Sequence, residues 1–166
     1  MKKIFLILSI LTLGLCGCNG QKSFSEKTLS MKLVDINNSE VVFKNVLAKH
    51  KGKTIVIEIW ASWCGDCVKA MPQMKELQAK NPDVVYLFIS MDKEYVKWTE
   101  GIEKHSLKGE HIWVNDPELM KGEFGKSLKV NWIPRYMVVD KNQKIVLFKA
   151  IETDFDKINE TLKNLN

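Results

Sequence analysis

The residues best suited to chemistry are two cysteines, Cys64 and Cys67, which stand in the segment Trp63-Cys64-Gly65-Asp66-Cys67. They follow an apolar, β-branched segment and open a segment with helical periodicity. At a helix N-terminus, free backbone N–H groups and the helix dipole favour the thiolate form of a cysteine. Cys67 then lies one turn away, where its thiol can attack a mixed disulfide on Cys64. The spacing therefore predicts thiol-disulfide exchange, with Cys64 as the exposed nucleophile and Cys67 as the buried resolving thiol.

The same cysteine pair could instead bind a metal ion through two thiolates. A structural zinc site needs about four ligands, and His50, His105 and His111 have no ligand spacing to the pair. We therefore predict no resident metal and no cofactor, while a metallochaperone that uses the pair as thiolate ligands stays open as an alternative. Peroxide reduction is disfavoured because no upstream cysteine stands in a peroxidatic setting.

Glu58 is a carboxylate inside an otherwise apolar segment, six residues before Cys64. A buried carboxyl group is costly unless it has a task or a partner. Burial would raise its pKa and suit it to moving a proton to or from Cys67. The alternative is that Glu58 lies at a strand edge or forms a salt bridge.

The elements that must position these residues alternate between strand and helix. Thr54 to Ile59 has the pattern of a strand buried on both faces, and Cys67, Met71 and Met74 lie on one face of the helix that follows. We expect Met71 and Met74 to pack in the core. The predicted strands cover residues 31–36, 40–43, 54–59, 84–91, 111–114, 136–139 and 144–150. The predicted helices cover residues 65–80, 94–105, about 117–128 and 154–165, with a helical turn at 45–50. In the helix over 94–105 we expect Val96, Trp98 and Ile102 to point inward. This order predicts an α/β fold with a mixed sheet flanked by helices.

The N-terminus has the pattern of an export signal. Lys2 and Lys3 precede an apolar run that is too short to span a bilayer as a helix. The run ends in Leu15-Cys16-Gly17-Cys18, which resembles the bacterial lipoprotein box. We predict a signal peptide over residues 1–17, lipid on Cys18, a polar tether over 18–27 and a folded domain over 28–166. An ordinary cleaved signal peptide and an uncleaved anchor are the alternatives.

Composition excludes several classes of protein. The chain has 166 residues, of which 45% are hydrophobic and 27% charged, as in one folded domain. Its formal net charge is +5, and the basic residues are scattered along the chain and form no run. We therefore expect no nucleic-acid partner. Four cysteines, two of them at the end of the N-terminal apolar run, are too few for a structural disulfide framework.

The segment Val56 to Cys67 resembles the active-site strand and loop of the thioredoxin superfamily. Pro72 matches the proline of the thioredoxin active-site helix, and Ile133-Pro134 resembles the cis-proline site of that family. The lipoprotein start, the extra N-terminal strands and the insertion over residues 92–116 resemble the TlpA-like branch of exported thiol-disulfide oxidoreductases. The resemblance covers about residues 28–166.

The resemblance implies roles for further residues. Pro134 would shape the groove beside the disulfide, and the Ile133 backbone would pair with an extended substrate chain as in β-augmentation. Trp63 would cover the site and contact partners. Glu58 stands where thioredoxins carry a buried Asp. Residues 84–91 lack the Lys that accompanies that acid in thioredoxins.

Two residues depart from the thioredoxin pattern. Asp66 replaces a Pro, and a carboxylate near Cys64 disfavours the thiolate, although an acid in the first helical turn interacts well with the dipole. Arg135 replaces a small Thr beside Pro134. Its charge could favour acidic substrates, pair with Asp66 or remain solvated.

These observations predict an enzyme of the cell envelope that faces the periplasm or extracytoplasmic space. It would exchange disulfides with protein substrates and draw electrons from a membrane donor, as a reductant. Operation as an oxidant or isomerase is the alternative, because the potential depends on small differences in thiolate stabilisation.

Overall fold

The computed structural model describes residues 22–165, so the predicted signal peptide and Cys18 lie outside the described residues. The strands are β1 (Lys32–Asp35), β2 (Glu40–Val42), β3 (Ile55–Trp60), β4 (Val85–Ser90), β5 (Glu110–Trp113), β6 (Arg135–Val139) and β7 (Ile145–Ala150). The helices are α1 (Glu26–Leu29), α2 (Phe43–Ala48), α3 (Gly65–Lys80), α4 (Tyr95–His105), α5 (Glu123–Ser127) and α6 (Phe155–Lys163), with a 3-10 turn η1 (Leu119–Lys121). The seven predicted strands occur in the predicted order, with helices between them where the sequence predicts, whereas α1 was not predicted.

The strands form one seven-stranded mixed sheet, in the order β2-β1-β5-β4-β3-β6-β7. The three central strands β5, β4 and β3 are parallel, and β1 and β6 flank them in antiparallel orientation. All six residues of β3 are buried, because a central strand of a covered sheet has no solvent face. This burial explains the continuous apolar run before Cys64 and places its carboxyl end in the middle of the sheet.

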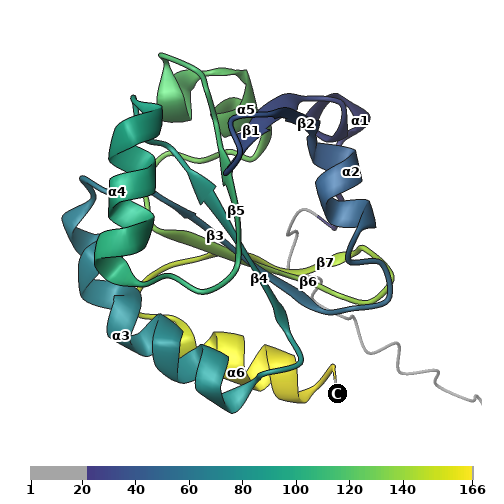
Figure 1. Cartoon of the computed structure of the whole chain (residues 1–166). Coiled ribbons are helices and arrows are strands. Elements are labelled where there is room, and N and C mark those ends of the chain that lie inside the picture. Colours follow the sequence, from purple (N-terminus) through teal and green to yellow (C-terminus); the bar gives the residue numbers. More distant parts are fainter. Residues whose placement is uncertain (1–21, 166) are drawn as a thin grey trace, which may run out of the picture.

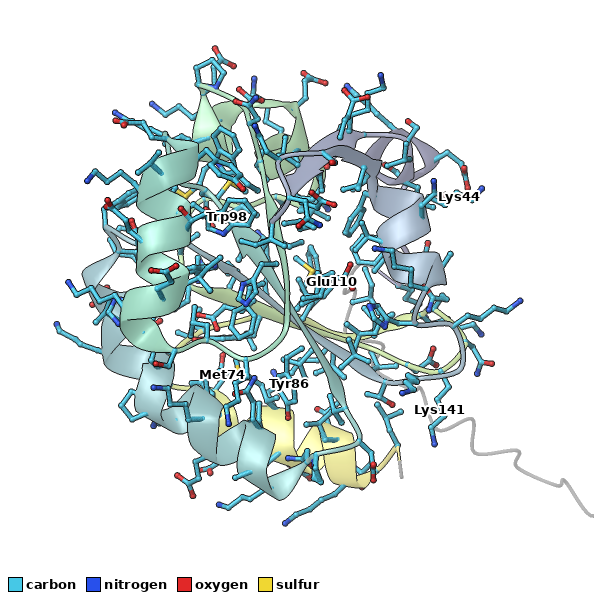
Figure 2. The ribbon with its side chains drawn as sticks, in the orientation of Figure 1. Lys44, Met74, Tyr86, Trp98, Glu110 and Lys141 are labelled. Carbon is cyan, nitrogen blue, oxygen red and sulfur yellow. A yellow bond between two sulfur atoms is a disulfide. The ribbon has the colours of Figure 1, made fainter. Side chains whose placement is uncertain are left out.

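The helices cover the sheet with apolar side chains. In Figure 1, α3 and α6 lie together on one side of the sheet, and α4 lies near the carboxyl ends of β3 and β4. Met74 of α3 and Trp98 of α4 point inward from their helices in Figure 2 and are almost fully buried. Core packing of Met71 and Met74 is confirmed. The fold is the predicted thioredoxin-like α/β arrangement.

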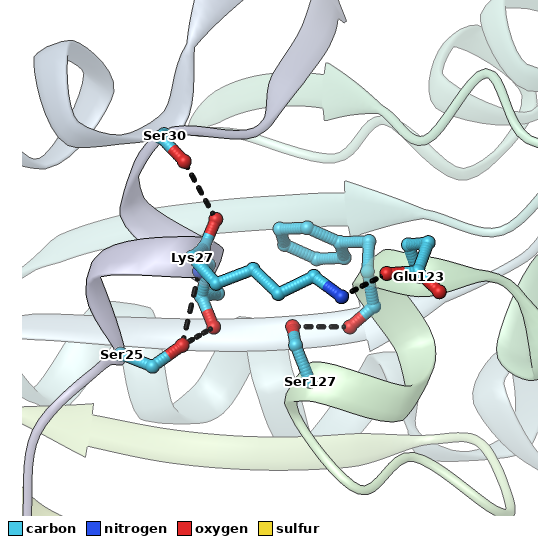
Figure 3. Close-up of polar contacts among 7 residues, drawn as sticks. Ser25, Lys27, Ser30, Glu123 and Ser127 are labelled. Carbon is cyan, nitrogen blue, oxygen red and sulfur yellow. Dashed lines mark hydrogen bonds and ion pairs between the residues drawn. The ribbon is translucent and has the colours of Figure 1, made fainter.

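The folded part begins before residue 28. Phe24 is buried and packs edge-to-face against Phe43, with ring centroids 5.2 Å apart. Ser25 caps α1 by accepting a hydrogen bond from the Thr28 backbone N–H at 3.0 Å. Lys27 forms an ion pair with Glu123 of α5 (Figure 3). The tether predicted for residues 18–27 is therefore wrong from residue 22 onward, because an apolar side chain and a helix cap dock this segment on the domain.

Two local expectations fail for identifiable reasons. The helix predicted over about 117–128 is broken, because Leu119 has a left-handed φ of 53° and Gly122 is extended. A Cβ at Gly122 would also overlap the Asp116 carboxylate. Val96, predicted to point inward with Trp98 and Ile102, is 57% exposed. The first turn of α4 therefore directs that position outward.

Candidate active site

The predicted cysteine pair lies at the junction of β3 and α3. Cys64 and Cys67 form a disulfide, and Cys64 is the N-cap residue of α3. The Cys67 backbone N–H lies 3.1 Å from the Cys64 Sγ and donates to it. Cys64 is 6% exposed, whereas Cys67 is completely buried. In this oxidised state Cys64 is less exposed than the sequence predicts, but it lies at the helix N-terminus and is the more accessible of the two cysteines.

The Ile133-Pro134 peptide bond is cis and lies beside the disulfide. The Ile133 carbonyl oxygen is 3.5 Å from the Cys64 Sγ, although the two residues are 69 positions apart in the sequence. In the oxidised pair the sulfur carries no proton, so this distance is a contact. After reduction, the Cys64 thiol can donate a hydrogen bond to the same oxygen. The structure thus brings the sequence-predicted segment 133–134 to the cysteines.

A hollow of about 270 Å³ opens at the disulfide. Its walls include Trp63 and Trp132, whose exposed fractions of 53% and 55% leave two large apolar surfaces in solvent. Met120 of η1 lines the same hollow. The sequence reasoning missed Trp132 and Met120 as site residues. For Trp132 the signal was its position directly before Ile133-Pro134, whereas Met120 reaches the site only through the folded loop.

Glu58 is buried on β3, with 3% of its surface exposed. Burial raises the pKa of Glu58 from 4.5 to about 8, while a hydrogen bond from Tyr136 lowers it in part. The Tyr136 hydroxyl donates to the Glu58 Oε1 at 3.4 Å. Burial and the neighbouring Glu58 in turn raise the pKa of Tyr136. Glu58 therefore has the environment of a group that exchanges a proton near neutral pH.

The two residues that depart from the thioredoxin pattern have different partners. Asp66 lies in the first turn of α3 and pairs with Lys69, with 3.6 Å between Oδ1 and Nζ. The Arg135 guanidinium donates to the Pro134 carbonyl oxygen and to Asn131 Oδ1, both at 3.3 Å. Within residues 22–165, Arg135 forms no ion pair with Asp66. Arg135 therefore braces the loop around Pro134.

The histidines His50 and His111 form contacts with residues other than the two cysteines. His50 pairs with Glu110, and His111 stacks on Phe88 with ring centroids 5.0 Å apart. Burial lowers the pKa of His111 and of His105. In the part of the chain that the structure describes, no cluster of three or more His, Cys, Asp or Glu side chains could hold a metal ion.

Two further features complete the description of residues 22–165. A larger hollow, about 550 Å³, lies at the opposite end of β3 and β4 beside Thr54 and Val85. It contains none of the predicted site residues, so size does not mark the reactive centre here. Among the described helices, none combines the length and apolar character needed to cross a membrane.

Comparison with known proteins agrees with this geometry. Residues 52–145, more than half of the chain, match the family described as thioredoxin-like. An uncharacterised protein of Haemophilus influenzae is 28% identical over 49% of this chain, which spans only 56% of that relative's length.

Two relatives cover more of the chain. The thiol-disulfide oxidoreductase ResA of Bacillus thuringiensis is 25% identical, covering 80% of this chain and 73% of that protein. The solution structure of a Bacteroides vulgatus protein assigned as a thiol-disulfide oxidoreductase is 31% identical, with a TM-score of 0.65. That match covers 82% of this chain and 89% of the other. The disulfide at the β3–α3 junction, the cis Ile133-Pro134 bond and these matches show that the chain belongs to the thioredoxin-like family and is a homologue of thiol-disulfide oxidoreductases.

Proposed function

We propose that this thioredoxin-like oxidoreductase is exported and exchanges disulfides with extracytoplasmic protein substrates through Cys64 and Cys67, working as a reductant. The observation that carries the proposal is the position of the disulfide at the N-terminus of α3, 3.5 Å from the Ile133 carbonyl oxygen and open to an aromatic-walled hollow. A sulfur in this place can be attacked from solvent, and the helix end stabilises the thiolate that leaves.

The proposed reaction moves two electrons from the dithiol to a substrate disulfide. The Cys64 thiolate attacks one substrate sulfur, so that a Cys64–substrate bond forms and the substrate S–S bond breaks. The released substrate thiolate takes a proton from water. Cys67 then loses its proton, attacks the Cys64 sulfur and releases the second substrate thiolate. A dithiol donor, which we propose to be a membrane protein, must reduce the resulting Cys64–Cys67 bond.

Glu58 is the proposed acceptor of the Cys67 proton. Both residues are buried, with exposed fractions of 3% and 0%, so a side-chain acceptor is needed where water has little access. With a pKa of about 8, Glu58 is mostly protonated at pH 7 and accepts a proton more readily as the pH rises. The resolving step is therefore expected to accelerate through about pH 8.

The proposed substrate-binding residues are Trp63, Ile133 and Pro134. We add Trp132, because it lines the same hollow at the disulfide. Exposed tryptophans supply apolar contact area at low entropic cost, as in many protein interfaces. The Ile133 backbone lies at the disulfide, where an extended substrate segment would pair with it in a β-like manner. The hollow between the two tryptophans would then receive a side chain that neighbours the substrate cysteine.

Asp66 supports the reductant direction. Its carboxylate stands two residues after Cys64, and a like charge disfavours the thiolate of the reduced state. A strongly oxidising couple needs the opposite, a stabilised reduced form. The ion pair with exposed Lys69 screens this effect in part.

The proposal that the protein is exported and anchored is based only on its N-terminal sequence. Residues 1–17 have the pattern of a signal peptide, and Leu15-Cys16-Gly17-Cys18 resembles a lipoprotein box. We place the enzyme on the membrane through lipid on Cys18, facing the periplasm or extracytoplasmic space. Metabolic labelling with a palmitate analogue is the direct test of that attachment.

The proposed function is tested by redox titration of the full chain in detergent, with Cys16 and Cys18 replaced by Ser. We expect a reversible two-electron couple near or below about −250 mV, and no couple in the additional variant Cys64→Ser. A couple near about −120 mV would identify an oxidant instead. Thiols that bind metal before they oxidise would replace the proposal by a metallochaperone.

A further inference from the structure

Asp92 is a second buried carboxyl group near the disulfide, on an element that the mechanism above does not use. It is the second residue after β4 and is 1% exposed. Its Oδ1 accepts a hydrogen bond from the Ser62 hydroxyl at 2.6 Å, and its Oδ2 accepts one from the Ser90 hydroxyl at 2.8 Å. The Ser62 backbone N–H donates to both carboxylate oxygens, at 3.1 and 3.0 Å. Three donors therefore converge on one side chain.

The Asp92 backbone is held as firmly as its side chain. Its N–H donates to the Ser90 hydroxyl oxygen at 2.9 Å. The Trp113 indole Nε1–H donates to its carbonyl oxygen at 2.7 Å. Asp92 is thus fixed to β4 and β5, two strands in the interior of the sheet. A carboxylate fixed in this way can serve as an anchor point for the loop that it contacts.

That loop is the turn that presents Cys64. The Cys64 backbone N–H donates to the Ala61 carbonyl oxygen at 3.1 Å, which makes residues 61–64 a β-turn with Ser62 at its second position. The Ser62 N–H points away from this bond and finds its acceptor in Asp92. From the other side, Gly101 of α4 packs so closely that an added Cβ would lie 2.7 Å from the Ser62 Cβ. Ser62 is therefore enclosed between a carboxylate and a helix.

We propose that Asp92 is a positioning residue for the redox pair, and this proposal rests on the function proposed above. By holding Ser62, the carboxylate fixes the 61–64 turn, so that Cys64 stays at the N-terminus of α3 within bonding reach of Cys67. Fixing the turn raises the effective concentration of one sulfur at the other. The clamp therefore favours the Cys64–Cys67 disulfide over the dithiol, which makes the dithiol a stronger reductant.

A charge effect must be separated from this geometric effect. Removing the negative charge of Asp92 would stabilise a nearby thiolate and would also weaken the disulfide. Asp92→Glu keeps the charge but moves the oxygens by one methylene, whereas Asp92→Asn removes the charge and places an N–H₂ donor where an acceptor is needed. Ser62→Ala keeps the Asp92 charge and deletes only one donated bond. If Asp92 acts by positioning, the Cys64–Cys67 disulfide should be less stable relative to the dithiol in all three variants. If it acts by charge, the disulfide should be less stable only in Asp92→Asn.

The experiment measures the equilibrium between the protein and glutathione, in which protein dithiol and glutathione disulfide give protein disulfide and two glutathione thiols. The full chain is used in detergent with Cys16 and Cys18 replaced by Ser. We expect Asp92→Asn and Asp92→Glu to lower the equilibrium constant about tenfold and Ser62→Ala about threefold. Asp140→Asn is the matched control, because Asp140 also accepts two backbone N–H bonds but lies at the far end of β6 from Pro134. It should leave the constant unchanged.

Three outcomes would overturn the inference. Equilibrium constants within twofold of wild type, together with a lower melting temperature, would make Asp92 a purely structural residue. A wild-type constant in Asp92→Glu with a loss in Asp92→Asn would assign the effect to charge. If both Asp92 variants fail to fold, a wild-type constant in Ser62→Ala decides against positioning. Absence of a reversible couple in the unmutated pair would instead contradict the proposed function itself.

Discussion

Two carboxyl groups that we propose to act on the cysteine pair, those of Glu58 and Asp66, stand in opposite surroundings. Glu58 is buried on the central strand, and its pKa rises to about 8 because the charged form loses its hydration. Asp66 is partly exposed and paired with Lys69, so its charge is screened by solvent and by its partner. The buried group can hold a proton at neutral pH, whereas the exposed group contributes a modest repulsion toward the Cys64 thiolate. The tasks proposed for them differ because Glu58 is enclosed, whereas Asp66 is in contact with solvent.

The raised pKa of Glu58 predicts a pH-dependent stability. The folded protein binds this proton more tightly than the unfolded chain, so the contribution is fully present below about pH 4.5 and is lost as the pH rises through about 8. At about 1.4 kcal/mol for each pH unit between these two values, the contribution is at most about 5 kcal/mol. In Glu58→Gln, the free energy of unfolding should decline less between pH 5 and pH 9, as measured by urea denaturation of the oxidised protein.

The matched control for this prediction is Glu76→Gln. Glu76 is exposed, and its hydrogen bond with Lys80 lowers its pKa, so it should not titrate between pH 5 and pH 9. Its stability profile should therefore run parallel to that of the wild type. Parallel profiles for wild type and Glu58→Gln would show that Glu58 does not keep its proton in the folded state.

At the scale of elements, the reactive turn is supported by a strand below it and a helix behind it. β3 ends at Trp60, and the turn at 61–64 leads directly into α3. Gly101 allows α4 to approach this turn, and the Trp98 side chain of the same helix is fully buried (Figure 2). The insertion between β4 and β5 therefore contributes to the site through packing rather than through a reacting group.

Gly101→Ala is expected to destabilise the protein by about 1–3 kcal/mol, because the new methyl group would meet the Ser62 Cβ at 2.7 Å. The loss should appear even though Ala favours helix over Gly by about 1 kcal/mol. Chemical denaturation of the oxidised protein measures the effect. Gly65→Ala is the control, since no heavy atom lies within 4 Å of an added Cβ there. Equal stabilities for the two variants would contradict close packing of α4 on the turn.

On the scale of the whole molecule, the domain begins close to the proposed anchor. The Lys22 carbonyl oxygen accepts a hydrogen bond from the Ile145 N–H at 3.0 Å, and Phe24 enters the core. Only four residue steps separate Lys22 from Cys18. A fully extended chain of that length spans at most about 14 Å. Lipid on Cys18 would therefore hold the domain close to the membrane surface, near a membrane-bound electron donor.

Lipidation predicts a specific labelling pattern. Cells that express the full chain and are fed a palmitate analogue should label the wild type but not Cys18→Ser, because the thiol that carries the lipid is missing. Cys16→Ser should still be labelled, since Cys16 lies in the proposed signal peptide, which would be removed before Cys18. Labelling of the Cys18→Ser variant, or loss of labelling in the Cys16→Ser variant, would contradict lipid attachment at Cys18.

The amino-acid sequence by itself determined the reactive pair, its place between a buried strand and a helix, and the fold class. These features are local, because periodicity over a few residues decides whether a segment forms a strand or a helix. The bounds of α3 agree with the prediction residue for residue, since the apolar spacing defines the segment and Asn81-Pro82 directly after it stops the helix.

The tertiary structure alone decided what surrounds the pair. The cis Ile133-Pro134 bond, the exposed Trp132 wall and the Asp92–Ser62 clamp come from segments 30 to 69 residues away from the residues that they contact. The exposure of Val96 and the docking of Phe24 depend in the same way on which faces the neighbouring elements cover. Such contacts depend on strand order and register, which bring distant segments together and leave no periodic signal in the chain.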